Sequence, residues 1–131
     1  MRNKISRSLI IATLTLSFTE IKDVAFAGPF EDSMAAYDRG DYATMLQLLR
    51  PLAERGNAQA QNSLGAMYYE GEGVAENFVR SHMWLNIAAA QGDPDAARMR
   101  DIVSKGMTAQ QLTEAQAMAL KCATSNYKQC D

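Results

Sequence analysis

The sequence predicts an all-α fold, a short α-solenoid in which antiparallel helix pairs stack on one another. Three observations predict it. Alanine and methionine are plentiful and β-branched residues are scarce after residue 27, which favours helix over strand. Several segments combine a helix-capping residue with apolar side chains at helical spacing. Residues 41–56 are echoed by residues 77–92, at a shift of 36 positions, and such a period is typical of repeat proteins.

Capping residues mark where most of the expected helices begin. The residues of N-cap type that precede a helical pattern are Asp41, Asn57, Asn77, Asp93 and Thr108. Thr108 and Gln111 have the spacing of a capping box, in which each side chain satisfies a backbone N–H of the other. The pattern therefore predicts helices at about 31–39, 41–55, 58–69, 77–91, 94–104 and 108–123.

The first 27 residues have the order of a secretory signal peptide. Three basic residues, Arg2, Lys4 and Arg7, precede an apolar run over 9–18, and an A-x-A site ends at Ala27. The alternative is a membrane anchor, but a bilayer span needs about 20 apolar residues. We expect residues 1–27 to be removed, leaving residues 28–131 without an integral membrane segment. The localisation expected is the bacterial periplasm, or secretion.

Residues 28–131 are acidic, with 9 Lys and Arg against 13 Asp and Glu. No basic run or stripe occurs in them. A nucleic-acid partner is therefore not expected, and neither is an anionic membrane surface.

The repeated unit is recognisable by its motifs. Residues 58–97 read AQAQNSLGAMYYEGEGVAENFVRSHMWLNIAAAQGDPDAA, with A-x-x-L-G-x-M-Y-x-x-G-x-G-V followed by an aromatic residue, a Trp and A-A-x-x-G. This pattern resembles the Sel1-like repeat family, a relative of the tetratricopeptide repeats. The resemblance implies paired antiparallel helices and an adaptor that binds other proteins, and it implies no shared reaction. The structural positions that it assigns are Leu64, Gly65, Tyr68, Gly71, Gly73, Trp84, Ala88, Ala89 and Gly92.

The expected domain organisation follows from these repeats. Residues 1–27 form the signal peptide and residues 28–131 form one Sel1-like repeat domain. Its units are about 31–56, 57–92 and 93–123, with a C-terminal disulfide cap over 122–130.

The three glycines of the LGAMYYEGEGV stretch are interpreted as parts of a structural joint. Gly65 lies in mid-helix, where a close helix crossing would favour it. Gly71 is placed to end the helix in a left-handed conformation, and Gly73 allows the chain to turn back. A phosphate loop is disfavoured, because its glycines would lead into a helix and the nearby Glu70 and Glu72 would repel an anion.

No residue pattern indicates catalysis or a cofactor. His82 is the only histidine, and no cluster of His, Cys or carboxylate groups accompanies it as a metal site would require. The acidic turn near Glu72 could bind Ca²⁺ weakly, but calcium prefers six to eight oxygens in a defined loop. We expect no metal and no cofactor, a partly buried His82, and Trp84 in the core.

Cys122 and Cys130 are the two cysteines, and in an exported protein an even number indicates a disulfide first. Eight helical residues would span about 12 Å, too far for the bond, so the chain must turn near Ser125. A redox pair or two free thiols are the alternatives. A bridge would fold this segment onto the exposed face of the last helix, with Tyr127 over it. Cysteine-rich secreted members of the Sel1-like family use a similar spacing, so the resemblance agrees.

The function expected is protein binding through the exposed stripe of the first helices. Its candidate residues are Gln59, Asn62, Ala66 and Tyr69 in one unit and Asp95 and Arg98 in the next. The alternatives are a small periplasmic hydrolase-type enzyme, which the lone His82 does not favour, and self-association through the open ends of the solenoid.

Overall fold

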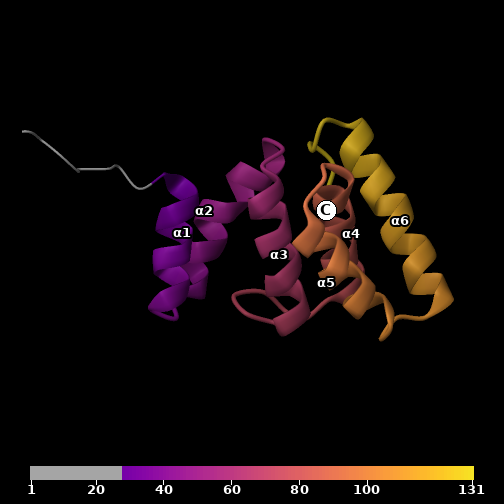
Figure 1. Ribbon diagram of the computed structural model, residues 1–131, viewed down its shortest axis with the longest axis horizontal. Coiled ribbons are helices and arrows are strands. Elements are labelled where there is room, and N and C mark those ends of the chain that lie inside the picture. The colour runs from indigo at the N-terminus through magenta and orange to yellow at the C-terminus, as the bar shows by residue number, and fades with distance from the viewer. Residues whose placement is uncertain (1–27) are drawn as a thin grey trace, which may run out of the picture.

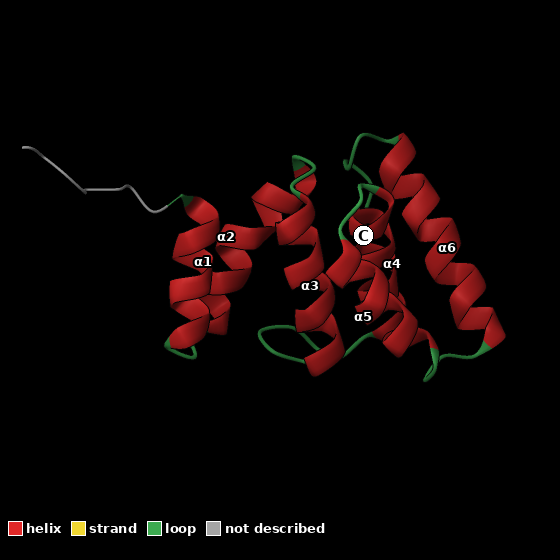
Figure 2. Cartoon of the chain, viewed as in Figure 1, coloured by secondary structure: helices red, strands yellow, loops and turns green. Residues whose placement is uncertain are grey.

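The structure, a computed structural model, describes residues 28–131. The expected signal peptide, residues 1–27, lies outside the described residues. The described chain folds into helices and loops with no strand (Figure 2), so the all-α class is confirmed. Its six helices are α1 (Pro29–Asp38), α2 (Tyr42–Glu54), α3 (Ala58–Glu70), α4 (Phe78–Ala90), α5 (Pro94–Ser104) and α6 (Ala109–Thr124).

The helix starts are set by local capping, as the sequence predicts. The side chains that accept a hydrogen bond from a backbone N–H of the first turn are Asp41, Asn57, Asn77, Asp93 and Thr108. Thr108 and Gln111 form the full capping box. The start of α1 was predicted two residues late, because its N-cap is Gly28, which has no capping side chain, and its signal is Pro29 in the first turn.

The helices stand in a row from α1 at one end to α6 at the other (Figure 1). Each of α1, α2 and α3 packs against the helix that follows it. Helix α4 is central to the second half, because α3, α5 and α6 all pack against it. Helix α6 thus lies on α4 rather than on α5, so the last two helices do not form the closed pair that the first two do.

The joint between α3 and α4 depends on two glycines. A Cβ at Gly65 would lie 2.5 Å from Cγ of Leu85, so only glycine fits this helix crossing. The Ser81 hydroxyl donates a 2.7 Å hydrogen bond to the carbonyl oxygen of Gly65, which holds the two helices together. Gly71 ends α3 at φ 70°, ψ 30°, the left-handed conformation predicted for it.

The core runs along the row in two clusters. The larger joins α1, α2, α3, α4, α6 and the C-terminal segment, residues 125–131. Trp84 lies within it at 1% exposure. The smaller lies between α4 and α5 around Leu85 and Val103. Tyr68 is buried as expected, and its hydroxyl lies within hydrogen-bond distance of Arg50 and Arg80. Apolar burial is therefore continuous from the first pair to α6.

Candidate functional site

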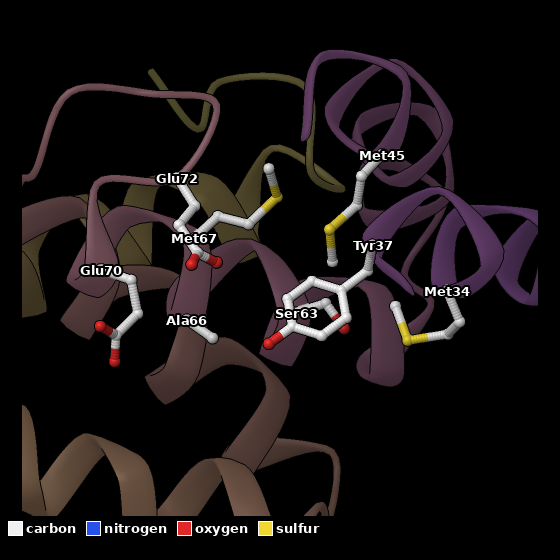
Figure 3. A pocket seen from close by; sticks show the side chains of 8 residues that line it. All are labelled: Met34, Tyr37, Met45, Ser63, Ala66, Met67, Glu70 and Glu72. Atoms are coloured by element: carbon white, nitrogen blue, oxygen red, sulfur yellow. The ribbon is translucent and has the colours of Figure 1, made fainter. Parts of the chain in front are cut away.

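A groove opens between the first helix pair and α3. Its volume is about 400 Å³, within the roughly 300–1,000 Å³ usual for ligand pockets. Figure 3 shows the side chains that line it, which come from α1, α2, α3 and the turn after α3. They are Met34, Tyr37, Met45, Ser63, Ala66, Met67, Glu70 and Glu72. We refer to this feature as the α1–α3 groove.

Helical spacing explains why these side chains meet. Ser63, Ala66 and Glu70 are three and four residues apart on α3, so they share one face of that helix. Met34 and Tyr37 are likewise three apart on α1. One wall of the groove is therefore a face of α3, and another is a face of α1.

The floor of the groove is made by buried thioethers. Met45 of α2 is 4% exposed and Met67 of α3 is 2% exposed. Their side chains extend towards each other from opposite sides of the groove (Figure 3). Tyr37, by contrast, is 48% exposed and stands at the edge. Methionine adapts its shape readily, so this floor can accommodate different apolar side chains.

One end of the groove is acidic. Within the described part of the chain, Glu70 and Glu72 are the only charged residues that line it, and both are carboxylates. Interaction with the Glu72 carboxylate raises the pKa of Tyr42. The groove thus combines an apolar floor with negative charge at one end.

The predicted binding stripe is only partly assembled. Ala66 lines the α1–α3 groove. Gln59 is exposed and Asn62 is partly exposed at other positions of α3. Asp95 and Arg98 lie on α5, where they form an exposed ion pair with each other. Their pairing fits the solvated surface expected of charged residues three apart on a helix.

Tyr69 differs most from its expected surface role. It is partly buried and stacks on Phe78 with ring centroids 5.4 Å apart, against the smaller core cluster. The Tyr69 ring, which the sequence analysis assigned to partner binding, therefore contributes to the contact between α3 and α4. The groove residues of α3 that the sequence analysis did not assign to a binding surface are Ser63, Met67 and Glu70. The available signal was their spacing of three and four residues from one another and from Ala66.

The C-terminal segment is joined by the expected disulfide between Cys122 and Cys130, both buried. Its direction differs from the expectation. Tyr127 does not cover the outer face of α6, where Leu120 remains 67% exposed. Instead, it packs inward on the larger core cluster and against Gly56 in the turn between α2 and α3. The Tyr127 ring can pack there because Gly56 has no side chain.

Asp131 ties the same segment to two helices. Its carboxylate accepts hydrogen bonds from Arg50 of α2, at 3.2 Å, and from Arg80 of α4, at 2.7 Å. The guanidinium of Arg80 also lies over the Tyr68 ring, 5.8 Å from its centroid. The C-terminal segment therefore links α6 to α2 and α4.

His82 is more deeply buried than expected, at 5% exposure. Burial lowers the pKa of His82, and the positive charge of Arg100 lowers it further. Its Nδ1 atom and the Nε1 atom of Trp84 have no hydrogen-bond partner among the described residues. No group of three potential metal ligands occurs within residues 28–131.

Within the part of the chain that the structure describes, no helix has the length and apolar character that crossing a bilayer requires. A scan against protein-family models finds no match to this chain, and a search among curated proteins finds none either.

Proposed function

We propose that residues 28–131 are a protein-binding module and that the α1–α3 groove is the surface that binds the partner. The observation that carries the proposal is the groove itself, about 400 Å³ with buried Met45 and Met67 as its floor and a partly exposed Tyr37 at its edge. Aromatic residues and Met are enriched where proteins bind one another. Of the six partner contacts expected from the sequence, this proposal keeps Ala66, because it lines the groove.

The helix packing supports a Sel1-like α-solenoid as the architecture. Gly65 lies at a close crossing, Gly71 ends α3, and Trp84 is core, as that family's repeat would require. The first two helix pairs fit a stacked arrangement, while α6 departs from it by packing on α4. Solenoids of this kind present grooves along their helices for other proteins.

Export to the periplasm is part of the same proposal. The Cys122–Cys130 disulfide supports it, because such bonds persist in oxidising compartments. The test is N-terminal sequencing of the protein recovered from a periplasmic fraction. A start at Gly28 is expected, and an intact Met1 would refute cleavage.

The binding surface is tested by photo-crosslinking in the cells that make the protein. A photoreactive residue placed at Ser63, in the groove, is expected to capture a partner protein. The matched control is the same residue at Ala117, exposed on α6. Equal capture at both positions, or capture at Ala117 alone, would refute the groove as the binding surface.

Self-association is the second candidate function, and one feature of α6 favours it. Leu120 is 67% exposed beside a smaller hollow of about 210 Å³ between α4 and α6. Leu120 of one copy could fill this hollow in another. Light scattering would then show a dimer that Leu120→Glu dissociates, and a monomeric wild-type protein would exclude this candidate.

A further inference from the structure

We propose that the α1–α3 groove selects a peptide segment in which an apolar anchor residue lies next to a Lys or Arg. This inference rests on the proposed protein-binding function and names the chemistry of its partner. It follows from two properties of the groove, its thioether floor and its acidic end.

The apolar part of the partner is specified by the floor. Met45 and Met67 are almost fully buried, and Figure 3 shows their side chains directed into the space between α1 and α3. Apart from the two carboxylates, the polar side-chain groups of its described lining are the hydroxyls of Ser63 and Tyr37. A side chain that enters the groove gains by leaving water for an apolar surface, and methionine can adjust to Leu, Met or Phe alike.

The basic part of the partner is specified by Glu70 and Glu72. No Lys or Arg of residues 28–131 lies among the side chains that line the groove. A segment that covers the groove would remove water from Glu72, which is already partly buried. A buried carboxylate without a cation is costly, so a neutral or acidic segment would bind weakly. A Lys or Arg beside the anchor would compensate for the lost hydration and would also speed the encounter.

The positions of the apolar floor and of the two carboxylates determine how far apart the anchor and the basic residue can lie in the peptide. Glu70 is in the last turn of α3 and Glu72 is in the turn that follows, while Ser63 and Ala66 lie earlier on the same helix. The apolar floor and the carboxylates are therefore neighbours and do not lie on separate faces. Figure 3 shows the two carboxylate side chains together on the α3 side of the groove. The anchor and the cation must accordingly be close in the peptide.

The experiment uses fluorescein-labelled peptides and the protein produced from its full coding sequence. The probe carries two Leu anchors beside two Lys residues, and its matched twin carries Glu in place of each Lys. Fluorescence anisotropy is expected to give about tenfold tighter binding of the Lys probe, the discrimination that one close charge pair commonly supplies. Its affinity is expected to fall with added salt, because part of the attraction is between charges.

Variants assign the preference to the groove. Glu70→Gln/Glu72→Gln is expected to abolish the difference between the two peptides and to leave the helical circular dichroism spectrum unchanged. The control is Glu114→Gln, an exposed acid on α6, which should keep the full difference. Ala66→Trp should fill the groove and block both peptides. If that variant does not fold, Ser63→Trp is used in its place.

Each outcome separates the two proposals. Equal affinity for the Lys and Glu peptides, with both blocked by Ala66→Trp, would overturn the charge preference and leave the binding groove standing. A preference for Lys that survives Glu70→Gln/Glu72→Gln would also overturn the inference. Absence of peptide binding, together with absence of crosslinks at Ser63, would overturn the groove as a binding surface.

Discussion

The ring of Tyr127 occupies the place of a missing side chain at Gly56. A Cβ built on Gly56 would lie 2.9 Å from Cε2 of Tyr127, closer than real contacts allow. Tyr127 itself has φ 62°, a left-handed conformation that non-glycine residues seldom adopt. The contact thus keeps a strained residue in place, and it joins the C-terminal segment to the turn between α2 and α3.

Substitution of Gly56 should reveal this contact when compared with Gly92. Both glycines have positive φ, 89° and 96°, so alanine is strained in both. Only Gly56 has a neighbour within 4 Å of the new Cβ. Gly56→Ala is therefore expected to lose about 1–3 kcal/mol more unfolding free energy than Gly92→Ala, the usual cost of overpacking. Urea denaturation measures both.

A double-mutant cycle provides the control for this comparison. In a Tyr127→Ala background the ring is absent, so the excess cost at Gly56 should disappear. An excess that persists without the ring would show that backbone strain, and not packing, distinguishes the two glycines.

Sequence reasoning succeeded where the signal is local. The capping box of Thr108 and the left-handed end at Gly71 depend on residues within one turn, so their spacing was sufficient to place α6 and the end of α3. The predicted position of the Tyr127 ring was wrong, because the ring packs on Gly56, which is 71 positions away along the sequence. No local pattern encodes such a contact.

The candidate groove could be predicted only in part for the same reason. Ala66 was placed on a binding face by its register on one helix, and it does line the groove. The floor joins Met45 to Met67 across two helices, which requires the packing of α2 on α3. Tyr69 was assigned to the surface because its stacking on Phe78 involves the next helix.

Gly65→Val should destabilise the protein far more than Ala66→Val. Both changes put Val at adjacent positions of α3. Helix propensity alone favours the opposite order, because Gly is about 1 kcal/mol less favourable than Ala inside a helix and Val lies between them. A side chain at Gly65 meets Leu85 at 2.5 Å and the Ser81 carbonyl oxygen at 3.2 Å, whereas Ala66 faces the groove. Overpacking at Gly65, where even a Cβ is too close to Leu85, is expected near the upper part of the usual range of about 1–3 kcal/mol. That exceeds the propensity difference, so Gly65→Val should have the lower melting temperature. Similar melting temperatures would contradict the close crossing.

Acid should weaken the fold through His82. Burial and Arg100 lower its pKa below the usual histidine value of 6.5 in the folded protein. The unfolded chain therefore binds a proton first as the pH falls. Stability is fully present above pH 6.5 and is lost progressively below it, towards the folded-state pKa. His82→Gln is expected to flatten this part of the curve of unfolding free energy against pH.

The comparison of the two proteins isolates the histidine, because Asp41, whose pKa the Thr44 hydrogen bonds lower, titrates in both. Urea titrations from about pH 7.5 to about pH 5 measure the effect. Parallel curves for the wild-type protein and His82→Gln would show that His82 does not contribute.

The disulfide should be the main stabilising link of the C-terminal segment. Closing a loop between residues 8 apart restricts the unfolded chain by about 2.5 kcal/mol in the entropy model. Reduction by dithiothreitol removes that restriction without changing a side chain. We expect the reduced protein to stay helical by circular dichroism, to melt at lower temperature, and to lose hydrogen-exchange protection first at the end of α6. Cys122→Ala/Cys130→Ala should behave in the same way, with a further loss from the two buried sulfur atoms.

The matched control is Asp131→Asn, which removes the ion pairs with Arg50 and Arg80 but keeps the disulfide. The side chains of Arg50 and Arg80 are 33% exposed and that of Asp131 is 55% exposed, so these pairs are screened by solvent. Their loss should cost at most about 1 kcal/mol, less than reduction. Thiol counting in denaturant without reductant checks the premise, because two reactive thiols in protein recovered from a periplasmic fraction would show that no bridge forms there. If reduction leaves the melting curve unchanged, the segment is held by Tyr127 on Gly56 and by Asp131, and the covalent bond adds nothing to stability.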